Sequence, residues 1–210
     1  MTSRQPDIQE LLQRARQGDQ QAVGALFDYY RQRLKRMVRL RMDRRLKGRV
    51  DPSDVLQDAY LDVSRRFAKY AAESSVPLFL WLRLVTGQKL TDLHRFHLGA
   101  QMRTPAREIS LHHGPMPQAS TASLAAQLLG RMTSASEVAI RAETRLRVEE
   151  AINSMDPIDR EVIALRHFEH LSNEETAQVL GISSNAASNR YVRAVRRLKE
   201  LLRAIPGLEP

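Results

Sequence analysis

Residues 172–203 constrain the fold of this chain most, because they predict two helices joined by a tight turn. Ser172 and Glu175 have the spacing of a capping box, in which a hydroxyl and a carboxylate satisfy free backbone N–H groups at a helix start. Gly181 stands where that helix must end, since glycine adopts positive φ without steric cost. Ser183 follows at the position of an N-cap, so a second helix should begin directly after it.

The second helix is expected from Ser184 to about Leu202, and it is both amphipathic and basic. A basic helix after a glycine turn is the layout of a helix-turn-helix, whose second helix enters the major groove of DNA. An ordinary helical hairpin with a solvated basic face is the alternative. The small residues Ala177 and Ala187 favour the helix-turn-helix, because they allow two crossing helices to approach closely. The predicted buried stripe consists of Ala187, Tyr191, Ala194, Val195 and Leu198, and the cations Arg190, Arg193, Arg196, Arg197, Lys199 and Arg203 should lie largely outside it.

Composition limits the class of protein. A chain of 210 residues suffices for one large domain or two small ones, and 42% apolar but only 5% aromatic residues indicate helices packed with Leu, Val, Ala and Met. The absence of cysteine excludes disulfides and thiolate metal sites and fits a reducing compartment. The N-terminal segment lacks the apolar run of a signal peptide, and the longest apolar stretch, residues 76–82, is too short to span a bilayer. We therefore expect a cytoplasmic protein without membrane insertion.

The charge of the chain points to a polyanionic partner, with a net value of +9 and an isoelectric point near 10.4. Residues 31–49 alone contain ten Lys or Arg and a single acid, Asp43. Such a run can be a solvated face or a membrane-surface helix. We favour a nucleic acid as the partner, because a second basic cluster lies on the predicted recognition helix.

Helical spacing predicts further helices on both sides of a break in the character of the chain. Between them, residues 99–136 hold scattered Pro, Gly and Ser, which predicts a flexible linker with a short helix near 123–129. We therefore expect an all-α fold of two small helical domains, 1–98 and 137–210, joined by this linker. The predicted helices cover residues 8–16, 20–47, 52–70 and 78–98 before the linker and residues 137–154 and 157–169 after it.

The order of these parts is specific. A basic helix is followed by an acidic helix starting DPSDVLQDAYLDV, then by FLWLRLVTGQKLTDLHR, a linker and the helix-turn-helix. From about Gln20 to Leu202 the chain resembles the sigma-70 family of bacterial RNA polymerase initiation factors, in its extracytoplasmic-function (ECF) subgroup. The resemblance implies a transcription initiation factor that binds core RNA polymerase, directs it to −35/−10 promoters and promotes DNA melting. It implies no catalytic residue, metal or cofactor.

The resemblance also implies a polymerase-docking surface in the first domain. Asp54, Gln57 and Asp58 match the positions that dock on the clamp helices of the largest polymerase subunit, and an acidic ridge suits a basic coiled coil. The alternative is that these residues merely solvate the outer face of an amphipathic helix. Ser53 lies within this acidic run, so a regulatory kinase acting on it would change the charge of the ridge.

The helix over residues 78–98 matches the part of the family that melts and reads the −10 element. Trp81 matches a family aromatic, or it is simply a core tryptophan. The loop 71–76 stands where relatives capture a flipped base. The residues implied to contact the −10 DNA, with an amide for a base edge and cations for phosphates, are Gln88, Lys89, His94 and Arg95.

The second domain matches the module that binds the −35 element as duplex DNA. Asn can pair bidentately with adenine and Arg with guanine, each contributing roughly 1–3 kcal/mol of discrimination. Gln88 and Ser188 replace residue types that are frequent in relatives, so the promoter sequence stays open. The residues implied to contact the −35 DNA, the last two mainly through phosphates, are Ser184, Asn185, Ser188, Asn189, Arg190, Arg193 and Arg197.

Other classes of function remain as alternatives. The chain has no glycine-rich phosphate loop, Cys nucleophile or HExxH, and its two spaced His pairs, 94/97 and 167/170, lack further ligands, so nothing points to an enzyme. A helix-turn-helix regulator that acts without polymerase would need only the second domain. An RNA-binding or membrane-surface scaffold would use residues 31–49. An anti-sigma factor would be a further partner of a sigma factor.

Overall fold

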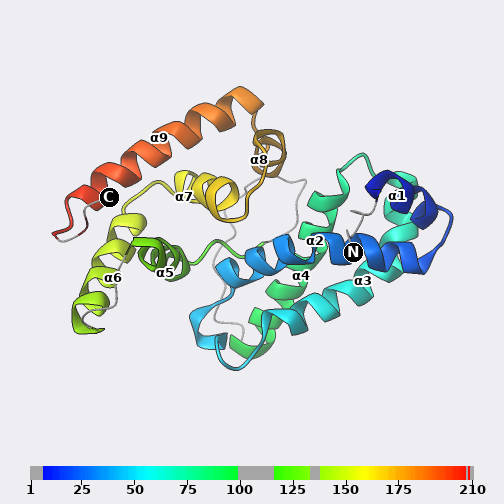
Figure 1. Ribbon diagram of the computed structural model, residues 1–210, viewed down its shortest axis with the longest axis horizontal. Helices are drawn as coiled ribbons and strands as arrows, with labels where there is room; N and C mark the ends of the chain where they lie inside the picture. Colours follow the sequence, from blue (N-terminus) through cyan, green and yellow to red (C-terminus); the bar gives the residue numbers. More distant parts are fainter. Residues whose placement is uncertain (1–6, 99–115, 133–137, 207, 209–210) are drawn as a thin grey trace, which may run out of the picture.

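The computed structural model describes residues 7–98, 116–132, 138–206 and 208. Within them the chain forms helices and turns without strands, which confirms the all-α prediction (Figure 1). The first half contains α1 (Ile8–Arg16), α2 (Gln20–Arg41), the 3₁₀ turn η1 (Arg44–Leu46), α3 (Pro52–Glu73) and α4 (Leu78–Leu98). The later part contains α5 (Thr121–Met132), α6 (Val138–Asn153), α7 (Pro157–Ile163), the π-helical turn η2 (Ala164–Phe168), α8 (Asn173–Leu180) and α9 (Ser184–Arg203).

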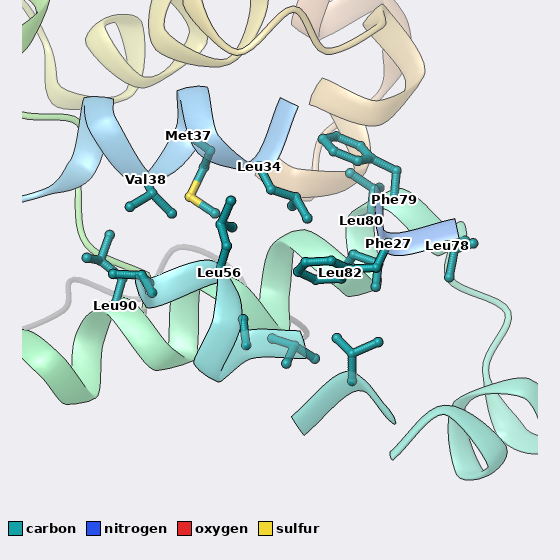
Figure 2. Close-up of a cluster of buried hydrophobic side chains, with 14 of the residues drawn as sticks. Phe27, Leu34, Met37, Val38, Leu56, Leu78, Phe79, Leu80, Leu82 and Leu90 are labelled. Atoms are coloured by element: carbon teal, nitrogen blue, oxygen red, sulfur yellow. The ribbon is translucent and has the colours of Figure 1, made fainter. Parts of the chain in front are cut away.

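The helices α1, α2 and α3 each begin after an aspartate and bury one apolar face. Asp7, Asp19 and Asp51 all accept backbone N–H groups of the following turn, and Pro52 then opens α3 as predicted. The buried faces of α2, α3 and α4 meet in one core, which Figure 2 shows in close-up. The side chains that meet there include Leu34, Met37, Leu56 and Leu90, each 0% exposed.

The helix predicted over residues 20–47 is shorter than expected. It ends at Arg41, because Met42 adopts extended backbone with φ −66° and ψ 129°. The chain then passes through η1, which Asp43 caps by accepting the backbone N–H of Arg45. Gly48 turns the chain toward α3 with φ 88°.

The second half has a buried cluster of its own, which also takes in Leu40 of α2. Ile152 of α6, Ile163 of α7 and Phe168 of η2 are buried against α9. On α9, Ala187, Ala194 and Leu198 are buried and Tyr191 is half-buried, as the predicted stripe requires. The stripe is wrong at Val195, which is 39% exposed.

The segment predicted as a flexible linker, residues 99–136, contains more structure than expected. Its helix α5 spans Thr121–Met132 and is longer than the short helix predicted near 123–129. Leu124 of this helix is buried in the core of the second half, and the backbone N–H of Ser120 donates to the carbonyl of Leu40 at 3.0 Å. Residues 99–115, which carry much of the predicted linker, lie outside the described residues.

The two halves pack against each other, which the sequence did not predict. Val162, Leu165, Leu171 and Leu180 of the second half belong to the same buried cluster as the core of the first half. Buried ion pairs also cross the contact, joining Arg41 to Glu161 and Glu169, and Arg83 to Glu169. In this structure the predicted domains 1–98 and 137–210 are in contact. That they are separate units stays a prediction.

Candidate protein and nucleic-acid interfaces

An acidic ridge, formed by Asp54, Gln57, Asp58 and Leu61, lies on the exposed side of α3. These positions follow the spacing i, i+3, i+4 and i+7, so they share one face of the helix. Leu61 is 50% exposed and adds an apolar group to the two carboxylates. Within the described part of the chain Asp58 has no ion pair, and Asp54 accepts the backbone N–H of Asp51 at 3.3 Å. The ridge therefore presents charge that the fold itself does not neutralise.

Asp62, one turn beyond Asp58, does not extend this ridge. Its Oδ2 lies 3.0 Å from Nζ of Lys89 on α4, and Arg65 and Arg66 lie 3.8 and 3.5 Å from its carboxylate. Asp62 is thus neutralised inside the fold and helps to hold α3 against α4.

Three of the four residues predicted to contact the −10 DNA reach the surface of α4. Gln88 is half-buried, and its Oε1 accepts from Nη1 of Arg66 at 3.1 Å. Lys89 is half-buried in its pair with Asp62. Arg95 is exposed, with its Nη1 3.9 Å from Asp92. The amide and the ammonium are therefore positioned by α3 before any ligand arrives.

His94 does not lie on the exposed half of α4, so its predicted placement is wrong. The residue is only 8% exposed, and its Nε2 accepts the backbone N–H of Asp43 at 3.2 Å. Burial lowers the pKa of His94 below its ordinary value of 6.5, and the opposing effect of the nearby Asp43 carboxylate is smaller. A neutral imidazole locked to η1 cannot hold a phosphate, so His94 instead fixes the end of α2 against α4.

Aromatic side chains gather beside the loop between α3 and α4. Trp81 stacks on Tyr70 with ring centroids 4.2 Å apart and an interplanar angle of 17°, and it meets the edge of Phe67 at 6.0 Å. The Tyr70 hydroxyl donates to the carbonyl of Val76 at 2.8 Å, which ties the loop to this stack. Trp81 is half-buried, so it both packs in the core and keeps part of its surface exposed.

The predicted helix-turn-helix is confirmed in its local geometry. Both hydrogen bonds of the capping box between Ser172 and Glu175 are present. Gly181 ends α8 in the left-handed region with φ 65° and ψ 33°, and the Ser183 hydroxyl accepts the backbone N–H of Ala186 at the start of α9. The turn therefore depends on the two features that the sequence singled out.

Most of the predicted −35 contacts are exposed on α9, but two are already bonded within the fold. Arg190 is half-buried outside the buried stripe, and its Nη1 lies 2.8 Å from Oδ1 of Asp159 on α7. The Ser184 hydroxyl lies 2.6 Å from the amide nitrogen of Asn173. Six of the predicted −35 contacts are exposed: Ser184, Asn185, Ser188, Asn189, Arg193 and Arg197.

The basic run 31–49 serves the fold as well as the surface. Arg41 is buried, and Arg33 pairs with Glu175 at 2.9 Å, whereas Lys35 Nζ donates to the Ser53 hydroxyl at 2.7 Å. Other cations of the run line a cavity of about 830 Å³ beside the start of α3: Arg36, Arg39, Lys47 and Arg49. Burial, and to a smaller extent the nearby charges of Arg145 and Arg44, lowers the pKa of Lys47.

Neither a metal centre nor a membrane span was found in the part of the chain that the structure describes. No three His, Asp or Glu side chains there are grouped so that they could hold a metal ion. None of its helices combines the length and apolar character needed to cross a bilayer.

Comparison with known proteins agrees with this arrangement. Residues 5–111 match the profile of the family described as ECF sigma factor, and residues 145–198 match that described as Sigma-70, region 4. The chain is 28% identical over 201 residues to the RNA polymerase sigma factor NccH of Alcaligenes xylosoxydans xylosoxydans, covering 95% of this chain and 97% of that protein. It is 24% identical to the ECF RNA polymerase sigma factor SigD of Mycobacterium tuberculosis H37Rv, with 95% and 86% covered.

Among solved structures, the fold is similar to that of CnrH in its complex with the cytosolic domain of CnrY. The TM-score is 0.54 at 24% identity, covering 94% of this chain and 99% of that one. The first profile spans more than half of this chain, and the second covers the helix-turn-helix half. The chain therefore belongs to the ECF sigma factors of the sigma-70 family, the transcription initiation factors that bind core RNA polymerase and direct it to promoter DNA.

Proposed function

We propose that the acidic ridge of α3 is the surface by which this sigma factor docks on the clamp helices of the largest polymerase subunit. The observation that carries the proposal is the contrast between Asp58 and Asp62. Asp62 is neutralised by Lys89 and its neighbours, whereas Asp58 is exposed and has no ion pair among the described residues. Unpaired carboxylates beside the exposed Leu61 fit a basic coiled coil that also offers apolar contacts.

The promoter contacts would then come from the two halves separately. For the −10 element we propose Gln88, Lys89 and Arg95, with Trp81 and the loop 71–76 beside them; His94 is withdrawn because it is buried. For the −35 element we propose the exposed residues of α9 named above, together with Arg190 once Asp159 releases it. The units that engage DNA would be residues 1–98 and 137–210, with 99–136 connecting them.

We also propose where this sigma factor acts and what regulates it. It would perform no chemistry of its own, since bond formation belongs to the polymerase that it recruits. It would act in the cytoplasm, where that polymerase meets DNA. An anti-sigma factor would be a natural regulator, because CnrH, whose fold is similar, was solved in complex with another protein, the cytosolic domain of CnrY. A regulator that acts without polymerase would leave the segment matching the ECF profile without a role.

The docking surface is tested with a charge-reversal variant and a matched control. Asp54→Arg with Asp58→Arg should weaken binding of core polymerase by about a hundredfold, the loss expected when two attractive contacts become repulsive. Asp28→Arg with Glu73→Arg makes the same change in net charge at exposed acids outside the ridge, and should bind normally. Because Asp54 also belongs to the capping box of α3, Asp58→Arg alone separates docking from helix stability. Unchanged binding by the ridge variants would reject this surface.

A further inference from the structure

Four charged side chains from the two halves form one buried cluster, which we call the ionic latch: Arg41, Arg83, Glu161 and Glu169. Arg41 and Arg83 belong to the first half, and Glu161 and Glu169 to the second. Nη2 of Arg41 lies 2.6 Å from Oε1 of Glu169, and Nε of Arg83 lies 2.8 Å from Oε2 of the same carboxylate. Glu161 completes the cluster by pairing with Arg41. The two positive and two negative groups balance one another.

Three of the four members of the latch are buried in the contact between the halves, and Glu161 is half-buried. Arg41, Arg83 and Glu169 are 3%, 4% and 1% exposed. Burial alone would raise the pKa of Glu169, but the charges and hydrogen bonds of Arg41 and Arg83 outweigh it and hold that pKa below its ordinary value. The carboxylate of Glu169 therefore depends on two groups from the other half.

Weaker contacts surround the latch on the same boundary. Arg33 of α2 reaches Glu175 of α8 at 2.9 Å while its guanidinium lies 3.5 Å from the ring centroid of Phe79. Nη1 of Arg41 also donates to the carbonyl of Pro117 at 2.8 Å, just before α5. The contact thus joins α2 and α4 to the segments on both sides of α6, as Figure 1 shows for α7 and α8 along α2.

Such a contact between the two halves can form and break reversibly. Buried ion pairs carry a desolvation penalty that nearly offsets their attraction. When the halves separate, all four groups regain water together, so the open form leaves no unpaired buried charge. The interface between the two halves contains charged as well as apolar residues, and such a mixed composition is typical of interfaces between domains that move.

With its two halves in contact, the protein is too small to span the distance between the −35 and −10 elements of a promoter. Elements centred at −35 and −10 are about 25 base pairs apart, or about 85 Å along B-form DNA at 3.4 Å per base pair. A compact chain of this length has a radius of gyration of about 17 Å and is about 45 Å across. The two halves cannot reach both elements while they are latched, so binding of the whole promoter requires them to part.

We propose that the ionic latch is an autoinhibitory contact, in which Glu161 and Glu169 of the second half hold Arg41 and Arg83 of the first and keep the free sigma factor closed. Polymerase and promoter must compete with this contact. The consequences for transcription rest on the proposed function, but the closed state itself is tested without polymerase. If the free chain is open for about a tenth of the time, releasing the latch raises its affinity for core polymerase about tenfold.

The test measures the distance between the halves in the free protein. Because the chain has no cysteine, spin labels can be attached through Gln13→Cys on α1 and Lys199→Cys on α9, which are both exposed. Glu161→Gln with Glu169→Gln should replace one narrow distance distribution by longer and broader distances, and should bind core polymerase about tenfold more tightly. Glu143→Gln with Glu150→Gln removes the same charge from exposed positions and should change neither quantity.

A milder variant keeps the test decisive if the double variant unfolds. Glu175→Gln removes the charge that pairs with Arg33, yet glutamine still serves in the capping box of α8. It should populate the longer distances partially. The proposal is overturned if the labelled wild type already shows long, broad distances, or if the folded latch variants keep its narrow distribution. If the wild type does not bind core polymerase, the proposed docking surface is wrong. The distances between the two halves still test the latch in that case.

Discussion

Replacing Glu169 by methionine removes one of the two negative charges from the ionic latch and leaves two buried guanidinium groups with the carboxylate of Glu161. Arg83 loses its ion-pair partner at 2.8 Å while remaining 4% exposed. Breaking a buried pair from one side costs roughly 3–5 kcal/mol, because the remaining charge has neither partner nor water. Arg83→Met should cost a similar amount, since it leaves Glu169 and Glu161 to share Arg41.

The double variant Arg83→Met with Glu169→Met has a different outcome. It removes one charge of each sign and leaves Arg41 paired with Glu161, so the cluster stays neutral. Exchanging a complete buried pair for apolar side chains is often neutral or stabilising. We expect the double variant within about 1 kcal/mol of the wild type, although each single variant loses up to about 3–5 kcal/mol while the halves stay docked. If the two halves separate in a single variant, its loss of stability is limited to the free energy that held the halves together. Water then reaches the unpaired charge.

Urea unfolding followed by helical circular dichroism at neutral pH measures these free energies. Acid provides an independent check, because pairing holds the pKa of Glu169 below its ordinary value of 4.5. The wild type should lose this contribution as the pH falls below that ordinary value, and the double variant should lack that loss. The reasoning is refuted if the double variant loses the sum of the two single losses, since the two groups would then act independently.

Three further predictions follow from single features of the fold. Burial lowers the pKa of His94, so the unfolded chain takes up the proton first and stability falls as the pH drops through 6.5; in urea unfolding, His94→Gln should lack this slope, and an unchanged slope would contradict the assignment. Gly181→Ala places a Cβ at φ 65° and should cost about 1–2 kcal/mol, measured by thermal melting, with an unaltered melt counting against the turn. Arg193→Ala with Arg197→Ala should weaken promoter binding by holoenzyme equally across −35 sequences and reduce the salt slope by about 2; a loss confined to one sequence would show base readout instead.

Local signals predicted most of the architecture. Asp51-Pro52 and the capping box at Ser172 mark helix starts because caps are satisfied by residues a few positions away. The same holds for Gly181, whose positive φ is a property of the turn itself. The exposed ridge at Asp58 followed from helical spacing, which sets the faces of α3 regardless of the rest of the fold.

The errors came from contacts between distant segments. Arg41 stands in a run of surface-like cations, although it follows the buried Met37 and Val38 at helical spacing, which the exposed Arg39 does not. Arg83 carried a signal that could have been used, because it interrupts the apolar run of residues 78–85 and therefore lies on a buried helix. His94 was misplaced for a similar reason: it follows the buried Leu90 at helical spacing and so turns toward the core.

The docking of the acidic ridge on polymerase is tested most directly by a photo-crosslinking residue at position 58 of the intact holoenzyme. The account predicts a crosslink from this position to the largest polymerase subunit, and little from position 28, an exposed acid on α2. Equal yields from both positions, or crosslinks from position 28 alone, would contradict it.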